Sequence, residues 1–365
     1  MPTLETTLSD SGHCSGSDKK LKLGLVGCGA VAERTHLPIL TSSATPFEVA
    51  VLVDASTARA QQLAQHYNVP NVMTDYTALV GAVDAVMVTL PNHMHAPATI
   101  HFLKHGIHVL VEKPMAISVH ECNQMIEAAA GSQAVLAVGL DMRFFDAYRF
   151  VKEILATGMM GKIKSVDLQQ GSIDRWPATT DARFGKHTAG GGVLTDEGVH
   201  MLDLLLWWLG PYSAIEYYDD AVGGVEANCL LTLRMECGTL GRVELSRTRL
   251  LRNTWLFQGE RGTVEVESWG YDPIIRVELG NNILLSGRTL QRGSAAHTKT
   301  LVFNRQLEDF ASAIRGGQNP FVSGEEGKRA VELIERCYAV KQPLIYPWSI
   351  ASRLQNKKSR RTTYA

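Results

Sequence analysis

The chain has 365 residues, 45% of them hydrophobic and 20% charged, which is enough apolar material for two packed domains. Lys and Arg number 36 against 37 for Asp and Glu, so no overall electrostatic field favours a nucleic-acid partner or an anionic membrane. The most apolar stretch, 199–209, includes Asp203 and is far shorter than the roughly 20 residues that cross a bilayer, so we expect no membrane span.

The two ends of the chain are polar. Residues 1–20 are rich in Ser, Thr, Gly and Asp and lack the apolar segment of a secretory signal, so we interpret them as a disordered leader. Residues 351–365 form a basic tail, which we interpret as a solvated end rather than a nucleic-acid arm. The six cysteines include no Cys-x-x-Cys pair, which predicts reduced thiols in a cytoplasmic protein and no zinc site.

Residues 21–140 alternate short apolar runs with amphipathic stretches. The apolar runs predict five strands, at 22–26, 48–53, 85–90, 108–111 and 134–138. The amphipathic stretches predict helices at 57–67, 95–105 and 119–130. Strands that alternate with helices of this length favour right-handed crossovers, so we predict an α/β fold with a doubly wound parallel sheet, a Rossmann domain.

Residues 141–350 have a different pattern, which begins with a helix at 147–157, a strand at 163–170 and a polar segment at 171–192. A helix at 198–209 precedes five β-rich runs, at 227–235, 239–247, 255–258, 263–267 and 274–279. Two helices follow, at 306–314 and 325–340. This order predicts a second, α+β domain with a mostly antiparallel open sheet that helices cover on one face.

The first predicted strand leads into a G-x-G-x-x-A motif that is typical of dinucleotide binding. Gly27 allows the tight turn, Gly29 lets the backbone approach a pyrophosphate, and the small Ala32 lets the helix pack on the strand. Ala30 and Val31 open that helix, whose N–H groups would bind the phosphates. By itself the motif is weak, because glycine turns after strands are common.

An acidic residue at the end of the second strand strengthens this interpretation. Asp54 lies near the expected distance from the motif and would accept hydrogen bonds from the adenosine ribose, which favours NAD over NADP. Arg59, one turn into the next helix, would stack on adenine or accommodate a 2′-phosphate, so NADP remains possible. The alternative is a turn-capping Asp54 in a Rossmann-like domain that binds another ligand.

The segment after the third long strand borders the nicotinamide side of the predicted cleft. Leu90, Pro91, Asn92 and His95 are therefore expected cofactor contacts. Alternatively, Asn92 is a plain helix N-cap and the histidines, with His93, are surface residues.

Glu112-Lys113-Pro114 ends the strand at 108–111, at the edge where open α/β sheets bind ligands. Proline breaks the strand and restricts the backbone of Lys113. With a dinucleotide at this edge, Lys113 is a candidate for polarising a substrate oxygen, and Glu112 is a further cofactor contact.

A second motif follows three glycines at 190–192. Asp196, His200 and Asp203 have the spacing that places side chains on one face of a helix. A histidine with a carboxylate one turn away suits general acid–base catalysis. Alternatively, Asp196 caps the helix and His200 is a half-buried surface residue, while a metal site is disfavoured because a second ligand group is not evident.

Together these motifs resemble the Gfo/Idh/MocA oxidoreductases, which include glucose–fructose oxidoreductase and inositol dehydrogenase. The resemblance runs from about 21 to 346 and rests on the order of the motifs at 27–32, 112–114, 190–200, 306–310 and 322–327. It implies a Rossmann domain followed by an α+β domain whose open sheet forms homodimers or homotetramers.

The resemblance also implies roles for individual residues. Lys113 would hydrogen-bond the reacting oxygen, His200 would exchange the hydroxyl proton, and Asp196 would orient His200 and pair with Lys113. Arg143 and Asp203 would contact substrate. Trp176 is a candidate for the pocket wall or packs under a loop. Many relatives carry Asn or Gln where Asp141 stands, which predicts an unusual substrate near that loop.

We therefore predict an NAD(P)-dependent oxidoreductase that acts on a secondary alcohol or ketone of a sugar, nucleotide sugar or cyclitol. One alternative is a glycosidase that uses bound NAD for transient sugar oxidation. Another is a non-catalytic dinucleotide or sugar sensor, which is disfavoured because such proteins tend to lose the Lys/Asp/His set that this chain retains.

Overall fold

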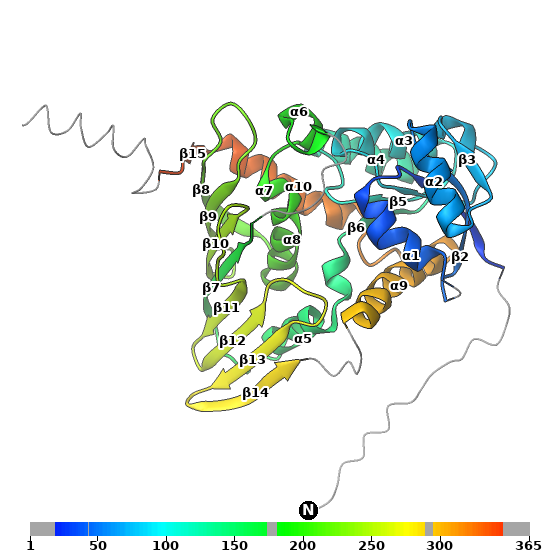
Figure 1. Ribbon diagram of the computed structural model, residues 1–365. Coiled ribbons are helices and arrows are strands. Elements are labelled where there is room, and N and C mark those ends of the chain that lie inside the picture. The colour runs from blue at the N-terminus through cyan, green and yellow to red at the C-terminus, as the bar shows by residue number, and fades with distance from the viewer. Residues whose placement is uncertain (1–18, 43, 174–180, 289–294, 346–365) are drawn as a thin grey trace, which may run out of the picture.

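The computed structural model describes residues 19–42, 44–173, 181–288 and 295–345 (Figure 1). Residues 21–139 form a six-stranded sheet with its connecting helices, and a nine-stranded sheet lies beside it. Within these ranges, none of the helices combines the length and the apolar character needed to span a bilayer.

The N-terminal sheet is entirely parallel, with the strand order β3-β2-β1-β4-β5-β6. This order is that of a dinucleotide-binding Rossmann sheet, as predicted. The strands are β1 Leu21–Val26, β2 Phe47–Val53, β3 Asn71–Met73, β4 Ala85–Val88, β5 His108–Glu112 and β6 Leu136–Gly139. Only β3 was not predicted, because it has three residues and no buried side chain.

Helices connect these strands: η1 Ala32–His36, α1 Leu37–Leu40, α2 Thr57–Tyr67, η2 Tyr76–Leu79, η3 Asn92–Met94, α3 His95–Lys104 and α4 Val119–Ser132. Hydroxyl N-caps start two of them. The Ser56 side chain accepts a hydrogen bond from the backbone of Arg59, and Ser118 accepts one from Glu121. The helix after the glycine turn contains a short π-helix, η1, and continues as the short α1.

The second sheet has the order β14-β13-β12-β11-β7-β10-β9-β8-β15. Its strands are β7 Ile163–Gly171, β8 Tyr212–Asp219, β9 Asn228–Met235, β10 Leu240–Ser246, β11 Thr254–Gly259, β12 Gly262–Glu267, β13 Ile274–Leu279, β14 Asn282–Arg288 and β15 Lys341–Pro343. Pairing is antiparallel except for β7 with β10 and β8 with β15. Sequence patterns did not predict β8, β14 or β15, since β14 and β15 are exposed and β8 is only partly buried.

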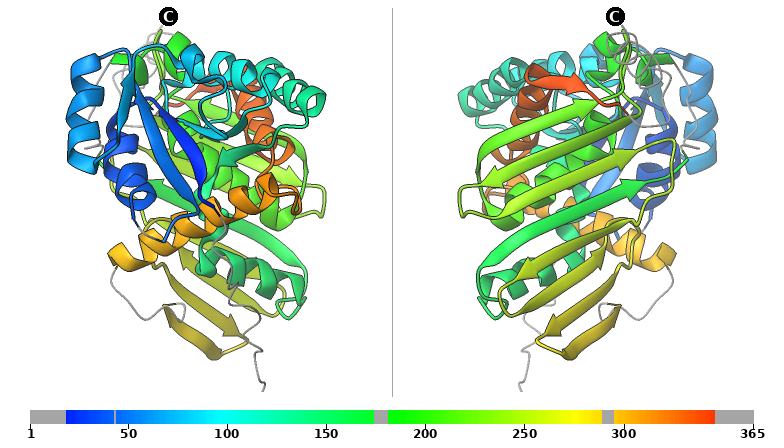
Figure 2. Two further views of the ribbon diagram at one scale, coloured as in Figure 1. Left: turned by 90° about the vertical axis from the view of Figure 1, so that its right-hand side faces the viewer. Right: turned by 90° about the vertical axis from the view of Figure 1, so that its left-hand side faces the viewer.

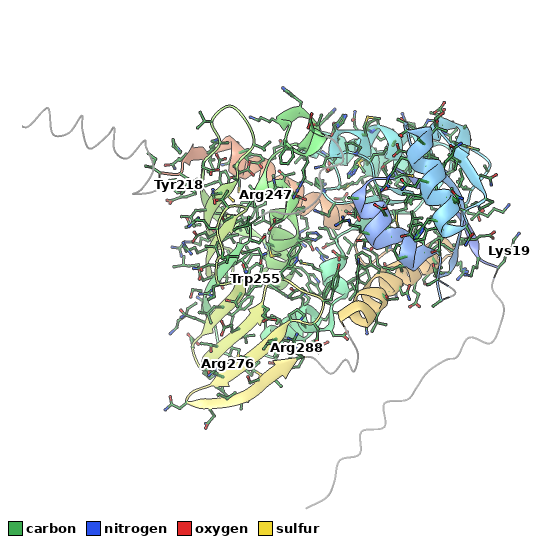
Figure 3. All side chains as sticks on the ribbon, in the orientation of Figure 1. Lys19, Tyr218, Arg247, Trp255, Arg276 and Arg288 are labelled. Carbon is green, nitrogen blue, oxygen red and sulfur yellow. The ribbon has the colours of Figure 1, made fainter. Side chains whose placement is uncertain are left out.

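Among the described residues, helices cover one face of the second sheet and leave the other face bare (Figure 2). The helical elements of this region are η4 Asp141–Phe144, α5 Asp146–Ala156, η5 Asp181–Arg183, α6 Lys186–Ala189, α7 Val193–Asp196, α8 Gly198–Leu209 and α10 Gly324–Ala339. Trp255 of β11 packs against Trp208 of α8, with ring centroids 5.1 Å apart (Figure 3). A continuous apolar core therefore fixes α8, which carries His200, to the sheet.

The C-terminal helices return to the first sheet. The helix α9, Ala295–Ile314, begins well before the predicted 306 and buries Phe303, Leu307 and Phe310 against the core around β1 and β2. Phe310 stacks on Phe47 of β2 at 5.7 Å between ring centroids. The backbone N–H of Val138 in β6 donates to the carbonyl of Val322, just before α10. Late segments of the chain thus complete the Rossmann core.

Candidate active site

The turn after β1 has the geometry that a dinucleotide requires. Gly27 has a φ of +104°, and a Cβ there would lie 2.6 Å from the Thr89 carbonyl oxygen, so only glycine fits. A Cβ on Gly29 would meet nothing within 4 Å. The backbone at Gly29 therefore faces open space at the start of a helical segment, where a pyrophosphate can be bound.

The residues that we predicted to contact the adenosine lie beside this turn. Asp54 accepts hydrogen bonds from the backbone N–H groups of Cys28 and Ser56, both at 2.8 Å. Arg59 donates to the Cys28 carbonyl at 3.0 Å and pairs with Glu33 at 2.6 Å. Asp54 is thus fixed beside the turn, with lone pairs left for ribose hydroxyls.

The segments after β4 and β5 are tied together by His95. Its Nδ1 lies 2.8 Å from the Pro114 carbonyl and its Nε2 lies 2.8 Å from the Leu90 carbonyl, within the core. The alternative of a surface histidine is therefore wrong for His95. Asn92 does not cap a helix with its side chain, which instead donates to the Ala189 carbonyl at 2.8 Å and joins the two halves of the molecule.

Glu112 is held by a partner that the sequence patterns did not reveal. Its Oε1 lies 2.6 Å from Nε2 of His36, a buried residue at the end of η1, and its Oε2 accepts the backbone N–H of Lys113 at 2.9 Å. Burial favours the neutral acid, but the His36 hydrogen bond and the Lys113 ammonium outweigh it and lower the pKa of Glu112 to about 2. Glu112 is therefore a fixed negative charge beside the predicted nicotinamide position.

The expected contact between Lys113 and Asp196 is present. Lys113 Nζ donates to Asp196 Oδ1 at 2.9 Å and to the Asp196 carbonyl at 2.8 Å, across the junction of the two halves. Asp196 Oδ2 accepts from Arg183 at 2.8 Å and from Arg247 at 2.5 Å. Arg247 follows β10 and is labelled in Figure 3. Neither arginine was predicted, because each lies far from Lys113 in sequence and outside any motif.

The three cations around the Asp196 carboxylate determine the charge states of Asp196 and Lys113. Burial disfavours the carboxylate, but Lys113, Arg247 and Arg183 hold the pKa of Asp196 well below its usual range. Burial likewise opposes the Lys113 ammonium, while Asp196 raises the pKa of Lys113 above its ordinary value. Lys113 is therefore a permanently charged donor at the edge of the sheet.

The expectation that Asp196 orients His200 is not met. Among the described residues, no hydrogen bond joins the two, because α7 ends at Asp196, α8 begins at Gly198, and the Asp196 carboxylate is turned toward its cations. Instead, Nδ1 of His200 lies 3.5 Å from Oδ1 of Asp141. Burial and the Lys113 charge lower the pKa of His200 to about 3, so its imidazole is neutral.

One side of His200 is bordered by an aromatic residue. The ring of Trp269, in the β12–β13 connection, lies edge-on to the imidazole at 6.1 Å between centroids. Trp269 is 48% exposed, so it presents apolar surface next to the acid–base residue. Trp176, the predicted wall residue, lies outside the described residues.

Arg143 and Asp203 do not lie at the opening of this site. The Arg143 guanidinium donates to both Asp203 carboxylate oxygens, at 2.9 and 2.6 Å, and to Glu326 of α10 at 2.6 Å. Arg143 and Asp203 are each 1% exposed. Because their polar atoms are satisfied inside the core, we assign this pair to holding η4, α8 and α10 together rather than to direct substrate contact.

With this geometry in hand, comparison with known proteins decides the family. Residues 21–140 match the model of the oxidoreductase family with an NAD-binding Rossmann fold, and residues 148–265 match the GFO/IDH/MocA C-terminal domain. The chain belongs to this family. It is therefore an oxidoreductase whose N-terminal domain is of the NAD-binding type.

Characterised relatives support the same placement. The D-glucoside 3-dehydrogenase of Escherichia coli is 31% identical over 195 residues, which cover 52% of this chain and 54% of that protein, about half its length. The 1,5-anhydro-D-fructose reductase of Ensifer adhaerens is 25% identical over 83% of this chain and 91% of its own length. The solved aldose–aldose oxidoreductase from Caulobacter crescentus has the same fold, with a TM-score of 0.77 and 23% identity over 88% of this chain and 97% of that one.

Proposed function

We propose that this enzyme transfers a hydride between a nicotinamide dinucleotide and the secondary alcohol or ketone carbon of a sugar, nucleotide sugar or cyclitol. The observation that carries the proposal is the Lys113 ammonium, fixed at the carboxyl end of β5 by Asp196 at 2.9 Å. A charged donor at this edge stabilises the negative charge that develops on a reacting oxygen.

When bound, the dinucleotide supplies the hydride acceptor or donor. Gly27 and Gly29, with the N–H groups of Ala30 and Val31, would hold its pyrophosphate, and Asp54 its adenosine ribose. Leu90, Pro91 and Glu112 would border the nicotinamide end. These positions fit the group because the turn at Gly29 is open and the strand ends converge there.

The residues of the chain itself have separate roles in the reaction. Lys113 donates a hydrogen bond to the reacting oxygen, and Asp196 holds Lys113 charged and in place. His200 accepts the hydroxyl proton during oxidation and returns it during reduction, because its neutral imidazole has a lone pair to offer. Trp269 supplies an apolar wall for the carbon skeleton.

We propose NAD rather than NADP as the preferred cofactor. Asp54 would repel a 2′-phosphate, and Arg59 already pairs with Glu33 at 2.6 Å. NADP would have to compete with that ion pair. The ratio of kcat/KM for the two cofactors measures this preference, and a higher value with NADP would reverse the assignment.

A substrate panel tests the reaction. The enzyme is offered glycosides, free sugars, nucleotide sugars and cyclitols with oxidised cofactor, and keto-sugars with reduced cofactor, while the absorbance of reduced nicotinamide is followed. We expect turnover on at least one polyol that carries a free secondary hydroxyl. Glycoside cleavage without net reduced cofactor would replace the proposal with the NAD-dependent glycosidase, and tight ligand binding without any turnover would replace it with the sensor.

We further propose that the enzyme is a cytoplasmic homodimer or homotetramer. The bare face of the second sheet (Figure 2) suits self-association, and the five described cysteines are unpaired thiols. Light scattering coupled to size-exclusion chromatography measures the oligomer, and a monomer at micromolar concentration would contradict it. Cell fractionation tests the compartment.

A further inference from the structure

The carboxylate of Asp141 faces His200 in the candidate active site. Asp141 begins η4, directly after β6, at the same sheet edge as Lys113. Its Oδ1 lies 3.5 Å from His200 Nδ1, longer than an ordinary hydrogen bond but within the range that tightens in loaded active sites. The side chains are 16% and 8% exposed, so bulk water does not separate them.

The other nitrogen of His200 has a different role. A neutral imidazole that turns a protonated Nδ1 toward Asp141 keeps the lone pair on Nε2. That lone pair can accept a substrate proton. Among the described residues, the buried Nδ1 of His200 has no hydrogen-bond partner, so Asp141, 3.5 Å away, is its candidate partner.

The surroundings decide which member of the pair carries a proton near neutrality. Burial and the Glu112 charge raise the pKa of Asp141 to about 7, and Lys113 opposes this rise. Burial and Lys113 keep the pKa of His200 low, at about 3. The other titratable groups that face Asp141 come from α5, the β12–β13 connection and α9: Tyr148, Tyr271 and Lys299.

We propose that Asp141 is the terminal proton acceptor in alcohol oxidation, reached through His200, and the proton donor in ketone reduction. The inference rests on the proposed dehydrogenase function. In oxidation, the substrate O–H bond breaks as an N–H bond forms at Nε2 of His200. The Nδ1–H bond of His200 then breaks as an O–H bond forms on Asp141, while the carbon-bound hydrogen leaves with its electron pair as the hydride that the dinucleotide accepts.

The relay has a defined pH dependence. Oxidation needs the ionised carboxylate, so its kcat/KM falls as the pH drops below the pKa of Asp141, about 7. Reduction needs the protonated acid, so its kcat/KM falls as the pH rises above that value. Lys113 stays charged throughout this range and does not produce either limb, because Asp196 raises its pKa.

A spectroscopic measurement tests the coupling without any substrate. Long-range proton–nitrogen spectra of the full-length protein, saturated with NAD, report the tautomer and charge of each imidazole, and the signals lost in His200→Gln identify His200. We expect a neutral, Nδ1-protonated His200 whose nitrogen shifts change between about pH 6 and pH 8 as Asp141 titrates. A His200 protonated at Nε2, or one whose shifts stay constant in the wild-type protein, would overturn the proposal whether or not a variant folds.

The variant Asp141→Asn supplies the second readout, because an amide of similar shape accepts a hydrogen bond but no proton. We expect it to lose the His200 shift change between about pH 6 and pH 8 and to lower kcat/KM for oxidation by about 10²-fold. We also expect the fall of kcat/KM for oxidation at acid pH, the acid limb of the pH–rate profile, to disappear in this variant. An unchanged limb, with or without a lower rate, would overturn the relay.

A matched control is Asp309→Asn, the same change at a partly buried carboxyl of α9 whose hydrogen-bond donor is the Phe321 N–H, at 2.8 Å. It should keep the wild-type limb and His200 shifts. If the substrate panel yields no turnover, the proposed function fails, but the imidazole spectra still decide whether Asp141 and His200 share a proton.

Discussion

Asp196 and Asp203 stand seven positions apart on consecutive helices, and each carboxylate is paired with arginine, but in different surroundings. Asp196 is 30% exposed in its side chain and accepts from three cations, one of them the catalytic candidate Lys113. Asp203 is inside the core and meets a single arginine in a bidentate pair.

The contrast shows how one kind of ion pair serves two purposes. At Asp196, the surplus of cations outweighs burial and lowers the pKa. At Asp203, burial raises the pKa and Arg143 opposes the rise. The first carboxylate is partly exposed, so a substrate oxygen can join its cations, and the second is buried and has no such access. We therefore expect changes at Asp196 to affect turnover and changes at Asp203 to affect stability.

The largest effect should follow Arg143→Met. It leaves Asp203 buried without its partner, so we expect the free energy of unfolding to fall by about 3–5 kcal/mol, measured by urea denaturation. Adding Asp203→Leu should recover most of the loss, since an apolar pair of similar volume replaces the buried charges. If the double variant is no more stable than the single one, the loss in Arg143→Met does not come from the unpaired Asp203 carboxylate.

Lys113→Met tests the other side of the comparison. We expect kcat/KM to fall by about 10²–10³-fold, or about 3–4 kcal/mol of transition-state stabilisation, with NAD affinity and stability nearly unchanged. The exposed Lys104 at the end of α3 offers a matched control, Lys104→Met, which should behave as wild type. Wild-type turnover in Lys113→Met would remove this lysine from the chemistry.

Asp196→Asn should give a smaller loss of activity, about 10²-fold or less, because Lys113 remains but is less well held. Without the carboxylate, burial and the two arginines favour a neutral amine, so the pKa of Lys113 falls. The alkaline limb of the pH–rate profile should therefore move to lower pH. A variant that instead loses as much stability as Arg143→Met would erase the distinction between the two carboxylates.

A third carboxylate, Glu112, should make the stability of the protein depend on pH in the acid range. The pKa of Glu112 in the folded protein, about 2, lies below its ordinary value of 4.5. As the pH falls, the Glu112 carboxylate is therefore protonated in the unfolded chain before it is protonated in the folded protein. Its stabilising contribution is present above about pH 4.5 and is lost toward pH 2. Glu112→Gln should weaken the acid dependence of stability by about 2 kcal/mol, measured by denaturation at several pH values. Glu127→Gln, at an exposed position of α4, should not.

Sequence reasoning identified the parts of this protein that depend on local pattern. Gly27, Gly29 and Lys113 could be placed because the carboxyl ends of neighbouring parallel strands share one edge. The Lys113–Asp196 contact followed from the family resemblance and is present. Arg143 and Asp203, expected to contact substrate, instead pair with each other in the core, and the other assignments of cofactor and substrate contacts stay predictions.

What could not be predicted depends on contacts between distant segments. His36, Arg183 and Arg247 reach the site from separate elements and belong to no motif. The spacing of Asp196 and His200 suggested one helix face, but α7 and α8 are separate and Asp141 takes the place beside His200. The short strand β3 and the exposed strands β14 and β15 carry too few buried residues for the alternation of apolar and polar residues to appear in the sequence.

The packing of α9 on the first sheet has a consequence for synthesis. Phe47 and its neighbours are made early, but Phe303, Leu307 and Phe310, which cover them, come near the end of the chain. At about 5–20 residues per second, the nascent Rossmann sheet waits roughly ten to thirty seconds with an uncovered apolar face. During that interval the uncovered apolar face is a surface at which the growing polypeptide is prone to aggregate.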